Sequence, residues 1–555
     1  MNITHQPTTQ ELYFLTIAEA AKLIASRKLS PVELTKAYLD RIGQLDDQLD
    51  AFITLTGERA LQEARRAEDA ISGGDYRGPL HGIPFALKDI YETAGILTTG
   101  HSKICIDNVP ARNATTVRRL YDAGAVLLGK LATHEFASGG PSLDLPWPPA
   151  RNPWNTAYFT GGSSSGSGAA VAAGFTPFAL GTDTGGSVRI PAALCGVAGI
   201  KPTYGRVSRH GVIPNSFSFD HCGPLAWSVE DCAIVLQHIA GHDPKDPGSA
   251  RREVPDYRAA LTGDIRGLRI GLVRHFWEDE EAIAEETKAA IERAIEVFRK
   301  LGAITEDVRL RTRQEYNDVK MVIAKAEIVA IHDRELRERP GDFSVDFLGR
   351  NLPGYLFQAT DYVRAQRERR LMIEELKPVF GKFDVLLTAS GTPAGRLDAL
   401  VGRGFSQRWE SSNIYTPFNV TGLPALMVCN GYSEHGLPLA MQIAGRPFDE
   451  ATVFRLGHAY EQATQWRSRR PALREGMKVQ PLTEPAPSNR VCALDESTRK
   501  LVQAAAKRAG LKLNEQQMQM LYAVAAPAFA SVERIRRDRP REDEPADVFG
   551  FGDGW

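Results

Sequence analysis

The stretch GGSSSGSGAAVAAG, from Gly161 to Gly174, joins a glycine- and serine-rich turn directly to a run of small apolar residues. A flexible linker would stay polar, whereas the alanines after Gly168 predict a tightly packed helix. A phosphate-binding loop would need a lysine, and none follows Gly166 or Gly168. The fragment from Gly162 to Gly166 matches the G-x-S-x-G pattern, but the residues before it make a poor buried strand. The stretch therefore needs a partner elsewhere in the chain to be interpreted as a catalytic site.

A second stretch, GTDTGGSVRIPAALCGVAGIKPTYGRVS, covers residues 181–208 and places two glycines directly before Ser187. Glycines leave their backbone N–H groups unshielded, which suits an oxyanion hole, so Ser187 is the candidate nucleophile. A nucleophilic serine needs a base. The candidates are His210 and His221, which stand in no motif, and a lysine that burial keeps uncharged. Lys88, at the end of the apolar run IPFALK, fits the second requirement.

The motif PFALKD around Lys88 and the two stretches above together resemble the amidase signature family, over roughly Ala18 to Trp466. The resemblance implies a triad in which Ser187 is the nucleophile, Ser163 is a bridging serine held by a cis peptide, and Lys88 is the base. This chemistry requires an uncharged lysine, and full burial lowers a lysine pKa by up to about 3–5 units. A serine hydroxyl both donates and accepts, so Ser163 can relay a proton between the other two.

The resemblance also assigns roles around the nucleophile. It implies that an oxyanion hole forms from the backbone N–H groups of Thr184, Gly185, Gly186 and Ser187. Ser164 and Asp183 are expected to hold the loops, and Arg189 is expected to anchor the turn after the nucleophile. The pocket walls are expected to come from residues 134–150, 315–360 and 400–416, and the loop around Trp147 is a candidate for that lining. No metal and no cofactor is expected.

The composition is that of a globular protein with balanced charge. Of the 555 residues, 43% are hydrophobic and 24% are charged, and 67 Lys+Arg against 68 Asp+Glu give a net charge of -1. This lack of a basic excess argues against nucleic-acid and membrane-surface partners. The 6 cysteines include no C-x-x-C pair, which argues against a zinc site. Because no signal peptide or membrane span is evident, a cytoplasmic protein is expected.

Apolar runs alternate with amphipathic helical patterns, which predicts an α/β fold. The resemblance makes this a mixed central sheet flanked by helices on both faces. We predict a catalytic domain over 1–470, a proline-rich linker over 471–491 and a helical appendage over 492–555. Helices expected at Asp495–Ala509 and Asn514–Arg537 carry apolar faces that must bury against the main domain or a partner chain, for example in a homodimer. The appendage resembles the small helper subunits of amidotransferases and carboxybiuret-type hydrolases.

The main functional prediction is a hydrolase that cleaves a small-molecule amide, such as an aryl amide, a urea-type compound or a carbamate, through a serine acyl-enzyme. Its expected partner is that substrate, without nucleic acid or membrane. One alternative is the glutamine-hydrolysing A-type subunit of a tRNA-dependent amidotransferase. Against it, Ser412 stands where that class often has an Asp, and zwitterionic glutamine needs paired charges. The other alternative is a non-catalytic binding protein, which the intact Lys88, Ser163 and Ser187 set argues against.

Overall fold

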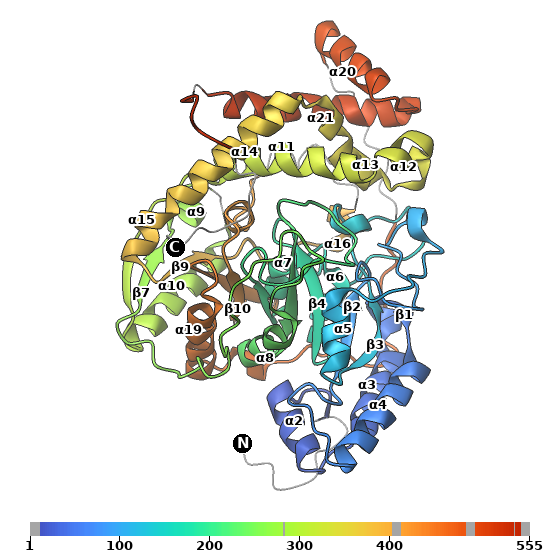
Figure 1. The fold of residues 1–555 in the computed structure, drawn as a ribbon, viewed down its shortest axis with the longest axis vertical. Coiled ribbons are helices and arrows are strands. Elements are labelled where there is room, and N and C mark those ends of the chain that lie inside the picture. The colour runs from blue at the N-terminus through green and yellow to red at the C-terminus, as the bar shows by residue number, and fades with distance from the viewer. Residues whose placement is uncertain (1–11, 281–282, 402–411, 484–493, 538, 546–555) are drawn as a thin grey trace.

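Within the residues described here, 12–280, 283–401, 412–483, 494–537 and 539–545 of a computed structural model, eleven strands form one mixed sheet (Figure 1). The strand order is β1-β3-β2-β4-β6-β5-β10-β11-β9-β7-β8. The strands are β1 (Phe52–Leu55), β2 (Pro84–Lys88), β3 (Val126–Leu131), β4 (Phe178–Asp183), β5 (Ala198–Lys201), β6 (His221–Ala226), β7 (Arg269–Leu272), β8 (Ile304–Asp307), β9 (Val385–Ala389), β10 (Ala425–Tyr432) and β11 (Pro438–Gly445).

The centre of the sheet is buried along its whole length. Every residue of β2, β3, β4, β5 and β6 is buried, which explains why these segments are nearly continuous apolar runs in the sequence. Strand β2 pairs in parallel with both β3 and β4, and β4 pairs antiparallel with β6. In the β2–β4 pair Leu87 lies opposite Leu180. The last residue of β2, Lys88, therefore lies beside the C-terminal half of β4.

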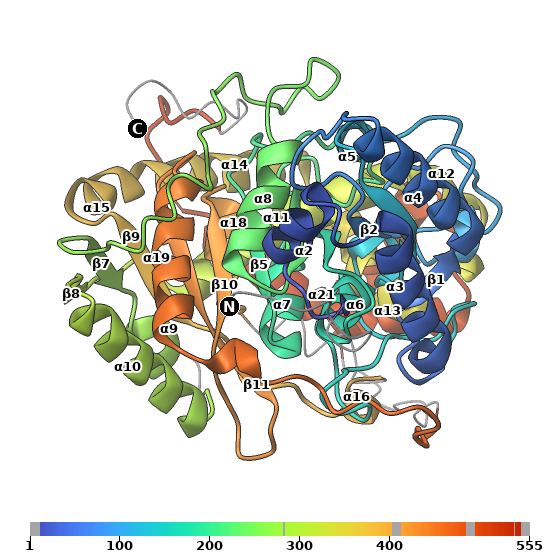
Figure 2. The same cartoon turned by 90° about the horizontal axis from the view of Figure 1, so that it is seen from below.

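Helices surround this sheet, which confirms the predicted α/β fold. Figure 2 shows α10 and α19 near the end of the sheet that holds β7 and β8, and α3 and α4 at the end that holds β1. The α-helices are α2 (Ile17–Ala25), α3 (Pro31–Leu45), α4 (Gly57–Ser72), α5 (Thr115–Asp122), α6 (Ser165–Ala172), α7 (Arg189–Cys195), α8 (Val229–Ile239), α9 (His275–Glu278), α10 (Glu285–Lys300), α11 (Arg313–Ile331), α12 (Asp333–Glu338), α13 (Val345–Asn351), α14 (Ala359–Glu374), α15 (Leu376–Lys382), α16 (Leu397–Leu400), α18 (Pro417–Val420), α19 (Glu450–Ala463), α20 (Glu496–Arg508) and α21 (Glu515–Ile535). The 3-10 helices are η1 (Asp46–Gln48), η2 (Lys103–Cys105), η3 (Glu135–Ala137), η4 (Pro340–Asp342), η5 (Leu352–Leu356) and η6 (Trp466–Ser468).

The C-terminal helices α20 and α21 form a tail that packs on the same chain. Helix α21 lies across α11, α13 and α14, and α20 is outermost (Figure 1). Leu521 and Ala525 of α21 are buried in one apolar cluster with Ile328 of α11 and Phe347 of α13. Leu501, predicted to belong to the buried face, is instead 56% exposed. Most of the apolar face for which the sequence left a partner chain open is therefore covered by the main body.

Some predictions about this region lie outside the described residues. These are residues 484–491 of the predicted linker and residues 492–493, 538 and 546–555 of the appendage. Among the helices that are described, none combines the length and apolar character needed to cross a bilayer. The described residues also contain no group of three or more His, Cys, Asp or Glu side chains placed to hold a metal ion.

Candidate active site

Lys88 is the last residue of β2, and its side chain is fully buried. Its Nζ donates to Ser163 Oγ at 2.7 Å and to Thr182 Oγ1 at 2.8 Å. Burial lowers the pKa of Lys88 to about 7, although the carboxylates of Asp220 and Asp183 act in the opposite direction. A large share of this amine is therefore uncharged near neutral pH, which is the state that can accept a proton.

Ser163 follows a cis peptide bond between Gly162 and Ser163, as the family resemblance implies. Glycine is required at the preceding position, because a Cβ on Gly162 would lie 2.0 Å from Cε1 of the His134 ring. The neighbouring Ser164 is buried, and its N–H donates to the backbone oxygen of Ser187 at 3.2 Å. The loop that carries Ser163 is thus fastened directly to the loop that carries Ser187.

Asp183 and Arg189 form a fully buried ion pair, with Arg189 Nη2 2.9 Å from Asp183 Oδ1. Asp183 also accepts the N–H groups of Gly186 at 2.7 Å and Val188 at 3.1 Å. Burial alone would raise the pKa of Asp183, but the Arg189 guanidinium holds it well below its ordinary value. The carboxylate therefore stays charged and fixes the turn around Ser187.

Arg189 extends this fixed network to the opposite side of the site. Its guanidinium also donates to the Tyr415 carbonyl at 2.9 Å, to Asn419 Oδ1 at 2.6 Å and to Gln442 Oε1 at 2.5 Å. The sequence singled out Arg189 but not these three acceptors, which lie more than 200 residues further along the chain. Only the folded sheet brings them together.

A cavity of about 240 Å³ is lined by both Ser163 and Ser187, together with Thr184 and Gly185. Lys88 reaches this cavity through its hydrogen bond to Ser163. Gly186 is placed differently from the prediction, because its N–H donates to Asp183. Of the four expected oxyanion donors, Thr184, Gly185 and Ser187 line the cavity, and Gly186 does not offer its N–H there in this structure.

Basic side chains dominate the charge of this cavity. Lys320 and Lys325 of α11 and Arg350 of α13 line it, and none of its described lining residues is Asp or Glu. Burial, reinforced by Arg350, lowers the pKa of Lys320 to about 8, so this amine is mostly protonated at neutral pH. Lys325 donates to Asn351 Oδ1 at 2.8 Å, and burial lowers its pKa well below the usual value. An anion entering the cavity would favour the protonated form of both lysines.

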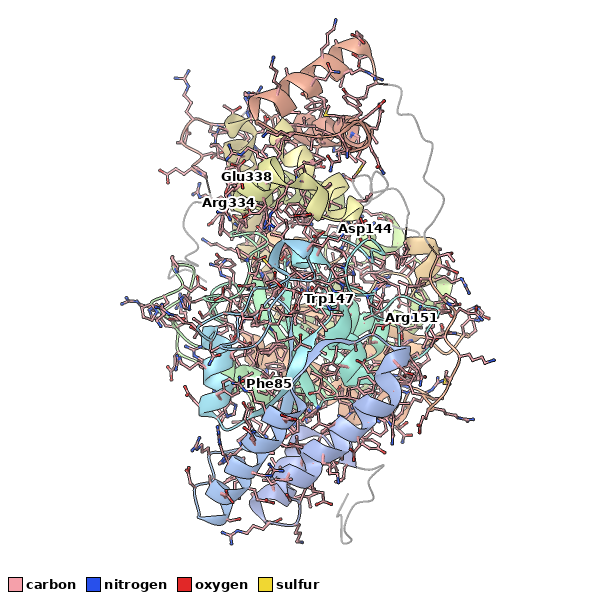
Figure 3. The ribbon with its side chains drawn as sticks, turned by 90° about the vertical axis from the view of Figure 1, so that its right-hand side faces the viewer. Phe85, Asp144, Trp147, Arg151, Arg334 and Glu338 are labelled. Carbon is pink, nitrogen blue, oxygen red and sulfur yellow. The ribbon has the colours of Figure 1, made fainter. Side chains whose placement is uncertain are left out.

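The sequence predicted where the cavity walls come from, but not which side chains matter. Described lining residues fall in all three predicted ranges, for example Ser138, Lys320 and Asn413. The basic residues were missed, although a lysine inside the apolar run KMVIAKAEIVA of α11 is a signal that could have found them. Trp147 is not among the described lining residues, and its carbonyl instead lies 3.0 Å from His101 Nε2 (Figure 3).

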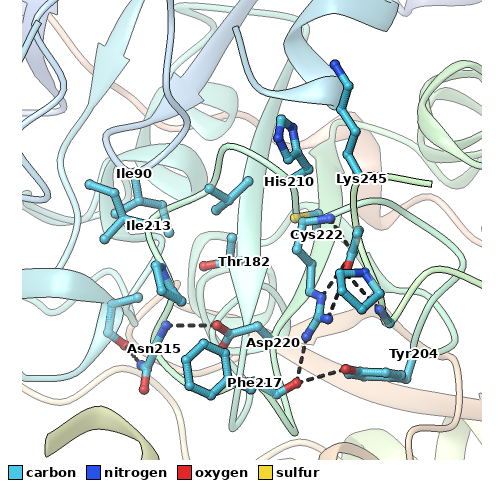
Figure 4. Close-up of a pocket in the computed structure, with 17 residues that line it drawn as sticks. Ile90, Thr182, Tyr204, His210, Ile213, Asn215, Phe217, Asp220, Cys222 and Lys245 are labelled. Atoms are coloured by element: carbon cyan, nitrogen blue, oxygen red, sulfur yellow. Dashed lines mark hydrogen bonds and ion pairs between the residues drawn. The ribbon is translucent and has the colours of Figure 1, made fainter. Parts of the chain in front are cut away.

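A larger cavity of about 630 Å³ lies next to the catalytic one (Figure 4). Thr182 lines it, so Lys88 contacts a residue of each cavity. Ala137 and Asn215 line both cavities, and Asn215 Nδ2 donates to the Ala137 carbonyl at 2.8 Å. Neither predicted serine lines the larger cavity. We therefore assign the candidate site to the smaller one.

The two histidines weighed as bases do not line the cavity that holds Ser187. His210 lines the larger cavity, and His221 Nδ1 is 2.6 Å from the Phe219 carbonyl. The amidase family model matches residues 33–454, the segment that supplies the whole site. The chain belongs to the amidase family. It is accordingly an enzyme of the class that hydrolyses amide C–N bonds.

Relatives of this amidase cover most of its length. The A-type subunit of glutamyl-tRNA(Gln) amidotransferase from Chloroflexus aggregans is 42% identical over 487 residues, which cover 83% of this chain and 99% of the relative. A solved structure described as a vestigial complex that reveals the origins of an s-triazine catabolic enzyme is 34% identical, with a TM-score of 0.75 over 81% of this chain and 98% of that one. Native peptide amidase from Stenotrophomonas maltophilia is 32% identical, with a TM-score of 0.69 over 82% of this chain and 98% of that one.

These comparisons correct the prediction about partners. From its balanced charge we expected this amidase to have a small-molecule amide as its partner and no nucleic acid. That prediction is wrong, because relatives at 42% identity are subunits of an enzyme that is named for its tRNA. Net charge failed as a criterion because one chain of a complex can take part in a tRNA-dependent reaction without itself carrying the basic surface that binds the tRNA.

Proposed function

We propose that Ser187, Ser163 and Lys88 hydrolyse an amide through an acyl-enzyme. Ser187 Oγ attacks the amide carbonyl carbon and gives its proton to Ser163 Oγ, while Ser163 passes its own proton to the uncharged Lys88 amine. The same two hydroxyl and amine groups then return a proton to the leaving nitrogen as the C–N bond breaks. Water repeats the sequence on the ester, releasing the carboxylic acid and restoring Ser187. The 2.7 Å contact between Lys88 and Ser163 is the observation that supports this route.

The negative charge that develops on the carbonyl oxygen needs donors fixed in advance. We assign this role to the backbone N–H groups of Thr184, Gly185 and Ser187, which line the cavity. The Asp183–Arg189 pair supports the assignment because it holds the intervening turn. Donors that are already oriented need no reorganisation during the reaction, and removal of one such donor typically costs about 10²–10³-fold in kcat.

For the substrate, we propose that the chain hydrolyses glutamine as the A-type subunit of a tRNA-dependent amidotransferase. Two observations support this. The curated relatives with 40–42% identity carry that function in their names. In addition, Lys320 and Arg350 give the cavity a positive charge that suits the α-carboxylate of glutamine. The ammonia released would then be transferred to a glutamyl-tRNA bound by other subunits.

The test is to incubate the purified chain with glutamine labelled with ¹⁵N in the side-chain amide, and to do so with and without glutamyl-tRNA, ATP and the remaining amidotransferase subunits of the same organism. The expected result is label in the tRNA-bound amino acid only in the complete mixture. A Ser187→Ala chain is the matched control and should transfer no label. Release of labelled ammonia without transfer in the complete mixture would contradict the proposal while retaining amide hydrolysis.

A second candidate is hydrolysis of a free amide that carries a carboxylate but no ammonium group. It is favoured by Ser412, which stands where the amidotransferase class often has an Asp, and by the lack of acidic side chains among the described lining residues. The similarity to the s-triazine-related structure agrees with it. Succinamate and glutamine separate the two candidates, because succinamate keeps a carboxylate and a primary amide but has no ammonium group. A higher kcat/KM for succinamate supports the second candidate, and a higher value for glutamine supports the first.

A further inference from the structure

Helix α11 forms a wall of the candidate active site with one face and meets the C-terminal tail with another. Asn317, Lys320, Met321 and Ala324 line the cavity at the helical spacing of three and four residues. Asp318, one position after Asn317, points instead toward α21, where its carboxylate meets Arg534. Any movement of α11 relative to the tail would therefore move cavity-lining side chains.

The contact between α11 and the tail is a two-point ion pair. Arg534 Nε lies 2.6 Å from Asp318 Oδ2, and Arg534 Nη2 lies 2.7 Å from Asp318 Oδ1. Gln314 Nε2 donates to the same carboxylate at 2.8 Å. The Asp318 side chain is only 2% exposed, whereas the Arg534 side chain is 44% exposed. Two parallel N–H···O bonds fix the relative orientation of the two helices as well as their separation.

We infer that Arg534 is a positioning residue that holds the α11 wall of the active-site cavity in place through Asp318. Removing the guanidinium leaves a nearly buried carboxylate without its cation, which is strongly unfavourable. The strain is relieved if α11 shifts so that Asp318 reaches water, and that shift displaces Asn317 and Lys320. The inference rests on the proposed function only in taking this cavity as the substrate site.

The tail supplies its own control. Arg536, two residues after Arg534, forms an ion pair with Asp361 of α14 at 3.3 Å, and Asp361 is also almost fully buried. None of the described residues that line the cavity belongs to α14. Arg536→Ala therefore removes the same kind of contact between the tail and a buried carboxylate, but from a helix that does not reach the cavity.

The experiment compares the full-length chain with its Arg534→Ala, Arg534→Lys and Arg536→Ala variants. Phenylmethylsulfonyl fluoride labels an activated serine when the serine oxygen displaces fluoride from sulfur, and intact mass reports the rate at Ser187. Succinate is then added to measure protection by a dicarboxylate. Arg534→Ala should leave the unprotected rate within about twofold and raise the half-protecting succinate concentration about tenfold, equivalent to about 1.4 kcal/mol. Arg534→Lys should be intermediate, and Arg536→Ala should match the native chain.

Equal protection in Arg534→Ala and the native chain would overturn the inference. So would an equal weakening in Arg534→Ala and Arg536→Ala, because the tail would then only hold the fold. If succinate fails to protect the native chain, carboxylate recognition in the proposed function is wrong, and backbone hydrogen exchange of α11 decides the inference instead. Faster exchange over residues 313–331 in Arg534→Ala than in Arg536→Ala supports it, and equal rates overturn it.

Discussion

Lys88 Nζ lies 2.7 Å from Ser163 Oγ although 75 residues separate the two in the chain. The lysine ends a central strand, and the serine stands in the loop before α6, so the sheet and the loop must both be formed before the pair exists. Because the amine is completely enclosed, its only way to exchange protons with a substrate at Ser187 is through this hydroxyl.

Replacing the lysine should abolish catalysis while preserving the fold. We expect Lys88→Met to lower kcat/KM by about 10²–10⁴-fold, because the substitution keeps an unbranched side chain but removes the proton acceptor. Lys103→Met, at an exposed lysine, is the control and should keep native kinetics. Steady-state rates and circular dichroism measured together would check this. Native rates in Lys88→Met would exclude the lysine as base.

The pH dependence of kcat/KM should be bell-shaped for a substrate that carries a carboxylate. The rate should rise as pH increases through about 7, because Lys88 must lose its proton to act as a base. It should fall as pH increases above about 8, because Lys320 then loses the charge that attracts the substrate. For a neutral amide such as propionamide the alkaline decline should be absent. An identical profile for both substrates would separate Lys320 from substrate binding.

Removing the charge of Lys320 should act on binding rather than on chemistry. We expect Lys320→Met to raise KM for a carboxylate-bearing amide by about tenfold or more, since a hydrogen bond to a charged group contributes about 1.5–3 kcal/mol. KM for propionamide should hardly change. Lys300→Met, at an exposed position of α10, provides the matched lysine control. A loss of kcat with unchanged KM would place Lys320 in the chemical step instead.

The buried Asp183–Arg189 pair should contribute strongly to stability. Asp183→Asn should lower the free energy of unfolding by about 3–5 kcal/mol, because it leaves the Arg189 cation buried with neutral partners only. Asp122→Asn breaks the exposed pair with Arg118 and should cost about 0.2–1 kcal/mol. Urea unfolding of the two variants measures the difference. Similar losses in both would contradict a special role for the buried pair.

The parts of this protein that depend on local sequence could be predicted, and those that depend on packing could not. Thr16 and Ser30 cap the first two helices as expected, since a cap needs only neighbouring residues. Lys88, Ser163 and Ser187 were found because each stands in a distinctive motif. Lys320 and Arg350 escaped, because which face of α11 or α13 turns to the cavity is decided by the helices packed behind them. The use of the Gly186 N–H by Asp183 is likewise a matter of turn geometry.

The pair between Asp318 and Arg534 joins positions 216 residues apart. A ribosome therefore completes the whole sheet and both serine loops before it adds the arginine that neutralises Asp318. A chain released early by a premature stop codon anywhere between these positions would keep the carboxylate without its counter-ion. The order of synthesis thus makes the last helix the final step in building this side of the cavity.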